Sequence, residues 1–295
     1  MDKKAIILGL SLVVSTALMA EANVPRGDFS AELNKMAGEQ GQFYIGKEDF
    51  PKDYFLVPNN LPFLAGLSLH HPMSSSLNLS DEQIKAIQEI KKRTVPPVVK
   101  ASQDIKRLEL KLAQNIAIDT NTAESQYEIV DAIGKLRIAL TKAHLQCIND
   151  VRAVLTAEQY KKLLAYAGNN KADKGSSKDK PKVHELVSFI HGGKMVKLHG
   201  DKLGITDAQA SRFANEIQMG FVPKIQKAMK RAKELDAIIK KGVYIEKKSS
   251  KDLAKEVAEL AAVKTEATNN RIEAFLVLRD ILSKEQFEKG WELIK

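Results

Sequence analysis

The sequence predicts an all-α fold made of two tandem helical-hairpin units. Apolar residues recur at steps of three, four or seven along most of the chain, without the alternation that marks a half-buried strand. The chain also repeats itself: residues 79–83 (LSDEQ) are answered 126 residues later by 205–209 (ITDAQ), and 155–159 (LTAEQ) 127 residues later by 282–286 (LSKEQ). Matches at a nearly constant offset predict two homologous units, at 67–168 and 187–295.

Residues 1–22 have the features of a secretory signal peptide in their usual order. Lys3 and Lys4 precede an apolar run over 5–20, and small residues surround the expected cleavage site after Ala22. We therefore expect export to a bacterial periplasm and a mature chain that begins at Asn23 and has no membrane span. An uncleaved anchor is the alternative, but the apolar run of about 16 residues is shorter than the roughly 20 that a spanning helix needs.

The segments outside the two units differ from them in composition. An extended arm over 23–66 precedes the first unit, and a linker over 169–186 joins the units. Residues 168–182 hold five lysines and no large apolar side chain. Such a segment buries too little apolar surface to offset its ordering entropy, so we expect a solvated linker.

In the first unit, a helix should begin after Ser80, which forms a capping-box pattern with the glutamine three residues later. Val95-Pro96-Pro97 should kink or break this helix, because proline removes an amide donor and clashes with the preceding turn. Helical spacing resumes over 105–116, a long helix is expected over 127–154, and Thr156 should cap a short last helix.

The second unit repeats this plan. Thr206 should cap its first helix, and Val222-Pro223 predicts a bend equivalent to the one in the first unit. A middle helix should end near Ile239, and a long helix is expected over 257–282. Each unit is therefore a long helical hairpin with shorter flanking helices.

Charge and composition limit the classes of partner. The chain has 46 Lys and Arg against 37 Asp and Glu, a formal charge of +9, which favours acidic partners. Aromatic residues make up 6%, too few for a platform that stacks nucleic-acid bases, and export would also separate the protein from nucleic acid. The single cysteine, Cys147, permits no intramolecular disulfide.

The pattern Leu-[Thr/Ser]-x-x-Gln near both ends of each unit resembles the LTxxQ family of periplasmic proteins, which includes Spy, CpxP and ZraP. The resemblance covers about 70% of the chain, in residues 79–83, 155–159, 205–209 and 282–286. It implies a curved, cradle-like helical shell. Family members are usually one unit long and form antiparallel dimers, so two fused units are expected to form a pseudo-dimeric cradle within one monomer.

The resemblance and the positive charge together predict an ATP-independent chaperone or envelope-stress adaptor, without enzymatic activity. Its partners would be non-native periplasmic proteins or a membrane sensor domain, bound in a basic trough between the two units. Cations and apolar residues of the first two helices in each unit are the candidate contacts: Lys92, Arg93, Val95, Val99, Lys100, Lys106, Arg107, Phe221, Val222, Lys227, Met229, Lys230 and Arg231. The alternative is that these lysines only solvate outer helix faces.

Histidines cluster ahead of the first helix of each unit and suggest a second function. Imidazole and thioether ligands suit copper, zinc or nickel. A metal-binding resistance or sensor protein would use His70, His71, Met73, His191, Met195 and His199, unless these are ordinary loop residues. His144 and Cys147 also have a spacing that could hold a metal, although a core thiol beside a boundary histidine is the favoured interpretation.

No pattern of catalytic residues stands out in the chain. A third hypothesis is an interaction module that docks one dedicated partner through the aromatic segment 43–66. The alternative is that this segment packs onto the protein's own helices.

Overall fold

The computed structural model describes residues 55–57, 61, 63–117, 121–169, 186–187 and 193–294. These residues form helices and no strand, so the prediction of an all-α fold is confirmed. The predicted signal peptide, most of the arm and most of the linker lie outside the described residues. Within them, none of the helices combines the length and the hydrophobicity needed to cross a lipid bilayer.

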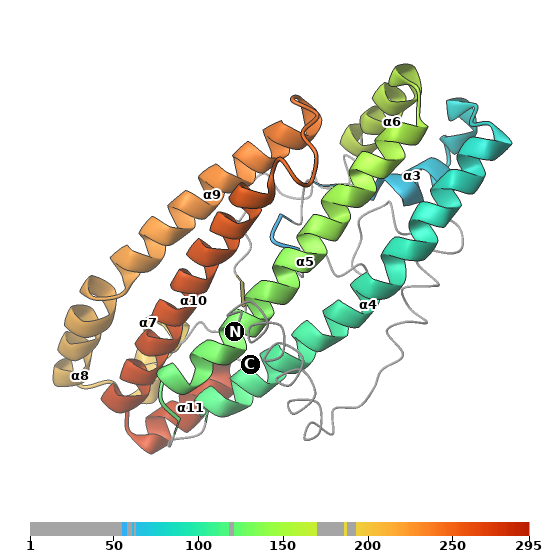
Figure 1. The fold of residues 1–295 in the computed structure, drawn as a ribbon. Coiled ribbons are helices and arrows are strands. Elements are labelled where there is room, and N and C mark those ends of the chain that lie inside the picture. Colours follow the sequence, from blue (N-terminus) through green and yellow to red (C-terminus); the bar gives the residue numbers. More distant parts are fainter. Residues whose placement is uncertain are drawn as a thin grey trace, which may run out of the picture.

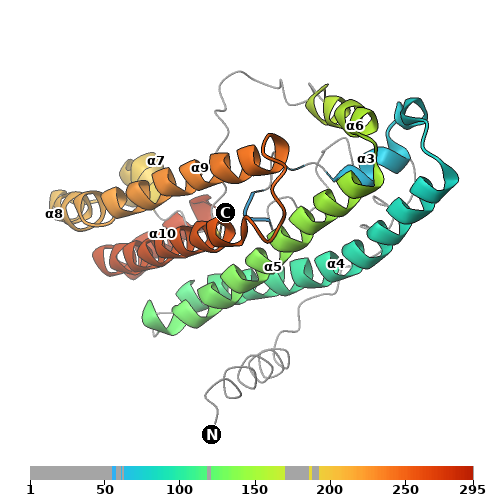
Figure 2. The same ribbon diagram turned by 45° about the horizontal axis from the view of Figure 1, so that its top comes forward.

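Four long helices form the body of the molecule. They are α4 (Asp81–Ala117), α5 (Glu124–Val154), α9 (Val222–Tyr244) and α10 (Ala254–Ile281). They lie side by side in the order α4, α5, α10, α9, as both ribbon views show (Figures 1 and 2). One hairpin is formed by α4 and α5 and a second by α9 and α10, and the two hairpins pack on each other through α5 and α10.

Shorter helices cover the two ends of this layer. Near the start of α4 lie α3 (Leu64–His70), which packs on α4, α5 and α6, and α6 (Ala157–Asn169). At the other end lie α7 (Gly193–Leu203) and α8 (Asp207–Arg212), and α7 packs on α11 (Lys284–Ile294). The two views separate α3 clearly from α7 (Figures 1 and 2).

The prolines act differently in the two units. In the second unit the helix breaks as predicted: a π-helical turn over Phe213–Met219 is followed by Gly220, and α9 then begins with Pro223 in its first turn. In the first unit α4 continues through Pro96 and Pro97, and it bends along its length (Figure 2). Both prolines are exposed, so the carbonyls that lose their intrahelical donors can be hydrated.

Each of the four Leu-[Thr/Ser]-x-x-Gln motifs forms a capping box, the arrangement that the sequence predicts at Ser80. The Ser80 hydroxyl accepts the backbone N–H of Gln83 at 3.2 Å, and the side chain of Gln83 accepts the backbone N–H of Ser80 at 3.0 Å. The same two bonds recur at Thr156, Thr206 and Ser283. Each box satisfies donors at a helix start that would otherwise lack partners.

The glutamines of the two boxes in a unit also bind each other, in a contact that we call the glutamine clasp. Gln83 Nε2 donates to Gln159 Oε1 at 2.9 Å, and Gln159 Nε2 donates to Gln83 Oε1 at 3.1 Å. Gln83 Nε2 also donates to the carbonyl of Val154, which ends α5. The clasp thus joins the start of α4, the end of α5 and the start of α6.

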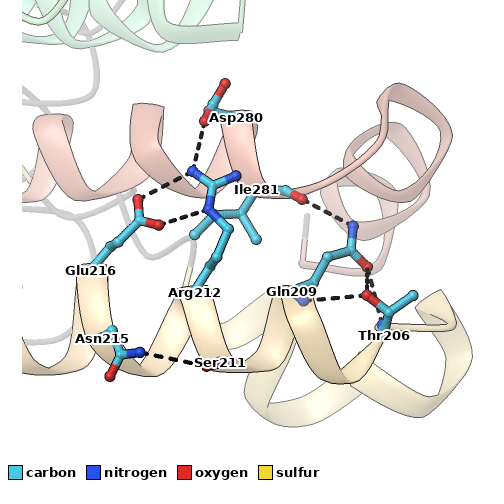
Figure 3. Close-up of polar contacts among 8 residues, drawn as sticks. All are labelled: Thr206, Gln209, Ser211, Arg212, Asn215, Glu216, Asp280 and Ile281. Atoms are coloured by element: carbon cyan, nitrogen blue, oxygen red, sulfur yellow. Dashed lines mark hydrogen bonds and ion pairs between the residues drawn. The ribbon is translucent and has the colours of Figure 1, made fainter.

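The second unit repeats the clasp with Gln209 and Gln286. Gln209 Nε2 donates to Gln286 Oε1 at 2.7 Å. It also donates to the carbonyl of Ile281, the last residue of α10, at 2.9 Å, as Figure 3 shows. Gln286 Nε2 donates back to Gln209 Oε1 at 3.2 Å. Arg212 adds a further link on the same side of α8 through its ion pair with Asp280 at 2.9 Å (Figure 3).

A left-handed residue precedes the first box of each unit. Asn78 has φ 49° and Gly204 has φ +64°, and the clasp glutamine of the last helix donates to the carbonyl of each. Asn and Gly are the residues that adopt this backbone region most readily. The two halves of the chain therefore repeat this local geometry together with the motif.

Part of the predicted arm belongs to the core. The side chains over 55–57 are buried, and so is most of the segment from Phe63 to Ser68. The aromatic segment therefore packs onto the chain's own helices at these positions, as the alternative to a docking arm expects. These residues belong to the same hydrophobic cluster as the long helices.

Replacing Gln209 with Ala should lower the free energy of unfolding by about 1–3 kcal/mol, since it removes the cap contact and leaves clasp partners unsatisfied. Urea titration followed by circular dichroism measures this loss. Gln226→Ala is the matched control, because Gln226 is exposed on α9. This control should change the free energy by less than about 0.5 kcal/mol.

The clasp also predicts that Gln209 and Gln286 are energetically coupled. In a double-mutant cycle of Gln209→Ala and Gln286→Ala, the coupling free energy should be at least about 0.5 kcal/mol. Strict additivity of the two losses would show that the glutamines act only as separate caps.

Candidate client-binding surface

The groove between the two hairpins is lined by α5 and α10, the second long helix of each hairpin. It has a volume of about 650 Å³, and its charged lining residues are Asp131, Lys135, Glu266 and Glu273. Three carboxylates and one amine do not make a basic surface. The expectation that the first two helices of each unit line a basic trough between the units is therefore wrong for this groove.

Small residues let α5 and α10 approach closely. A Cβ added to Gly134 would lie 3.2 Å from the Oγ1 of Thr265, and Ala258, Ala261 and Ala262 line the same groove. The helices run antiparallel, because Tyr127 near the start of α5 meets Glu273 in the second half of α10. The Tyr127 hydroxyl donates to this carboxylate at 2.5 Å, and burial together with this bond raises the pKa of Tyr127 to about 12.

Polar contacts fix the opposite end and the middle of the same interface. Ser250, just ahead of α10, donates its Oγ to Gln146 at 2.7 Å and its backbone N–H to Asn149 at 2.8 Å. In the middle, the backbone N–H of Leu56 donates to the Thr141 Oγ1 of α5 at 2.8 Å. The buried Nζ of Lys264 in α10 donates to the carbonyl of Leu56 at 2.7 Å. Residues 55–57 therefore bridge the two units.

The two outer long helices, α4 and α9, carry more net positive charge than the two inner ones, α5 and α10. The sequence of α4 contains eight basic and five acidic residues, and that of α9 contains seven basic and two acidic residues. In contrast, α5 contains four of each, and α10 contains four basic and five acidic residues. The positive charge of the long helices thus resides on α4 and α9, which flank the shared groove.

The predicted client-binding lysines are exposed on these outer helices. Lys100 and Lys106 lie on α4, and Lys227 and Lys230 lie on α9. Lys92 is exposed as well, but it pairs with Glu89 at 2.7 Å. The four lysines on the exposed faces are the cations most available to an acidic partner.

The three predicted arginines are tied into ion pairs. Arg93 binds Asp150 of α5 at 2.5 Å, and Arg107 binds Asp104 at 3.1 Å within α4. Arg231 binds Glu259 of α10 at 2.6 Å. Two of these pairs join an outer helix to its inner neighbour, so these guanidinium groups also serve the packing of the hairpins.

The apolar residues predicted to contact a client differ in how exposed they are. Val95 and Val99 are each 7% exposed and belong to the core, so they are not part of an open surface. Their spacing with Val98, Ser102 and Ile105 marks the buried stripe of α4, a signal that the sequence contains. Phe221, Val222 and Met229 are half-buried at the start of α9, where the Lys224 ammonium lies 5.4 Å from the Phe221 ring centroid.

Other apolar side chains, which were not predicted from the sequence, are exposed on or beside the basic helices. Ile238 in α9 is 40% exposed and Ile245, which follows α9, is 72% exposed. Met219 ahead of α9 and Leu110 in α4 are exposed too. Met219 and Ile245 lie before and after α9, so the apolar spacing of that helix does not predict their exposure.

The histidine segments do not form one metal site in the described residues. His70 and His71 lie at the end of α3 and Met73 is exposed beyond them, whereas Met195 and His199 lie on α7 at the other end of the molecule. Met195 is fully buried against Gly290 of α11. His191 lies outside the described residues, in which no group of three His, Cys, Asp or Glu side chains could hold a metal ion.

His144 and Cys147 are core residues, as the sequence favours. The His144 ring lies 4.8 Å from the ring of Phe55, in a tilted arrangement. Burial raises the pKa of the Cys147 thiol to about 12. A buried, protonated thiol is a poor metal ligand and a poor nucleophile.

Comparisons of the chain with protein-family models, with curated proteins and with solved structures found no match. The resemblance to the LTxxQ family therefore remains a prediction from the motifs.

Widening Gly134 tests the close approach of α5 to α10. Gly134→Leu should lower the free energy of unfolding by about 1–3 kcal/mol, because the added atoms would push α10 away at Thr265. Ala139→Leu adds a similar side chain at an exposed position of the same helix and should have little effect. Equal stability of the two variants in urea titrations would contradict the close approach.

The raised pKa of Cys147 predicts slow alkylation of the native protein. At pH 8 the native thiol is protonated, whereas in denaturing urea its pKa returns to about 8.5 and a sizeable fraction is thiolate. Reaction with iodoacetamide, followed by mass spectrometry, should be at least about 100-fold slower without urea. Comparable rates in the two conditions would show that the thiol is accessible in the folded state.

Proposed function

We propose that the protein is a periplasmic, ATP-independent chaperone or stress adaptor that binds non-native acidic proteins on the outer helices α4 and α9. It does so without catalysing a reaction. The observation that carries this proposal is the pairing of exposed lysines, which bind no carboxylate of the described residues, with exposed apolar side chains on or beside the same helices. The predicted signal peptide supports the compartment, and the four Leu-[Thr/Ser]-x-x-Gln motifs support membership of the LTxxQ family.

The arrangement suits weak binding of many partners. Exposed lysines attract acidic chains over a distance of about one Debye length, roughly 8–10 Å at physiological salt. Ile238 and Ile245 then offer apolar contact that does not require a particular partner sequence. Lysine suits this role, because its flexible stem and point charge need no fixed geometry, whereas the arginines are held by their carboxylates.

The rigid layer beneath the outer helices supports the same role. The glutamine clasps hold the helix ends of each hairpin, and α5 and α10 hold the hairpins together. A surface that stays folded can bind an unfolded chain without being unfolded by it. We also propose that these helices form the curved, cradle-like shape that the family resemblance implies.

A suppression assay tests the proposal. Aggregation of an acidic model protein, such as reduced α-lactalbumin, should fall in the presence of equimolar protein without ATP. Replacing Lys100, Lys106, Lys227 and Lys230 with Gln should remove most of this suppression, because the attraction at α4 and α9 is lost.

A matched control has the same net charge. Lys142, Lys161, Lys255 and Lys284 are exposed on α5, α6, α10 and α11, and their replacement with Gln should leave suppression nearly unchanged. Equal losses in the two variants would show that only total charge matters. Absence of suppression by the parent protein would refute the chaperone function itself.

A further inference from the structure

A second hollow lies at the end of the molecule formed by α3 and the start of α4. Its volume is about 730 Å³, in the range of small-molecule sites. It is lined by Ser68, Leu69, His70, Ser74, Ser75, Asn78, Leu79, Ile84, Gln88, Lys91 and Lys92. None of these side chains is acidic, although the chain as a whole has 37 acidic residues.

The cationic part of the hollow is centred on Lys91. Its Nζ lies 3.3 Å from the Nε2 of His70, and it is half-buried. Burial lowers the pKa of Lys91, the direction expected because no carboxylate among the described lining residues offsets the cost of desolvation. The adjacent Lys92 pairs with Glu89, which does not line the hollow. Lys91 is therefore a cation that an anionic ligand would stabilise.

Neutral donors accompany this cation. Ser74 and Ser75 contribute hydroxyl groups from the short helical turn after α3, and Gln88 contributes an amide from α4. A carboxylate has two oxygens, whereas a phosphate monoester has three terminal oxygens and a charge near −2 at neutral pH. The number and type of donors thus fit phosphate better than carboxylate.

The rest of the lining suits the organic part of such a ligand. Leu69, Leu79 and Ile84 provide apolar surface in the same hollow. A phosphate group alone would fill only a small part of the volume. A ligand that combines a phosphate with a short apolar or polyol group would use both kinds of lining.

We propose that this hollow is a binding site for a phosphate monoester, with Lys91 as its principal cationic contact and Ser74, Ser75 and Gln88 as donors. The second unit does not repeat it, because Gln218 and Met219 stand where the repeat offset of 127 would place Lys91 and Lys92. The site is therefore a property of the first unit. It shares α4 with the proposed client surface, but its lining includes none of the lysines Lys100, Lys106, Lys227 and Lys230.

Calorimetry with the full chain tests the site, with glycerol 3-phosphate as the soluble probe. Vesicles of phosphatidylcholine with and without phosphatidic acid form the second arm, because that lipid carries the same phosphate monoester. We expect Lys91→Gln to weaken binding at least about tenfold. Lys85→Gln, which removes an exposed lysine of α4 outside the hollow, should leave binding unchanged.

A second pair of variants tests the site independently, in case Lys91→Gln does not fold. Ser75→Asp places a carboxylate in the hollow at an exposed position and should abolish binding, whereas Ser76→Asp places the same charge in the same turn outside the lining. The site is supported if binding of a probe is lost in Lys91→Gln or Ser75→Asp and kept in the controls. The probe that binds, glycerol 3-phosphate or phosphatidic acid, then identifies the source of the phosphate. Absence of binding to both probes, or equal losses in variants and controls, overturns it.

Discussion

The glutamine clasp is the interaction on which the rest of the structure depends. In each unit the glutamine of the first motif performs three tasks: its oxygen caps its own helix, and its nitrogen binds both the partner glutamine and the carbonyl that ends the long inner helix. The glutamine of the second motif caps its own helix, binds the first glutamine and donates to carbonyls just ahead of the first motif. Only a side chain with both a donor and an acceptor can do this. Glutamate would lose the donor, and asparagine is one methylene shorter. The requirement explains why the glutamine recurs in all four motifs, while Ser and Thr exchange freely at the cap.

With the helix ends held in this way, the packing of the two hairpins depends on how closely α5 and α10 can approach. Gly134 and the alanines of α10 remove side-chain bulk at the contact, and Thr141, Ser250 and Lys264 make hydrogen bonds there. Lys264 is 1% exposed, and its ammonium would be costly to bury without the carbonyl of Leu56. The short segment over 55–57 is therefore part of the interface, since it supplies an acceptor to one unit and a donor to the other.

The sequence predicts the local features well, because their causes are local. A hydroxyl residue followed three positions later by glutamine specifies a helix start, and the apolar spacing specifies the helix that follows. The continuation of α4 through Pro96 and Pro97 could not be predicted, since it depends on the core packing of Val95, Val98 and Val99. The separation of the histidine segments was equally hidden: they occupy related places in the two units, and the antiparallel packing of α5 on α10 places α3 and α7 far apart.

The distribution of charge follows from the same packing. The helices that form the contact between the units must bury much of their surface, and unpaired charge there would carry a large desolvation cost. Positive charge therefore accumulates on α4 and α9, where one side remains in water. Arginines on these helices bind carboxylates of α5 and α10 and contribute to the hairpins, which leaves the lysines as the mobile cations of the surface. A fold that keeps its centre nearly neutral thus produces two basic flanks, and a partner attracted by charge would meet the outer helices before the groove between the units.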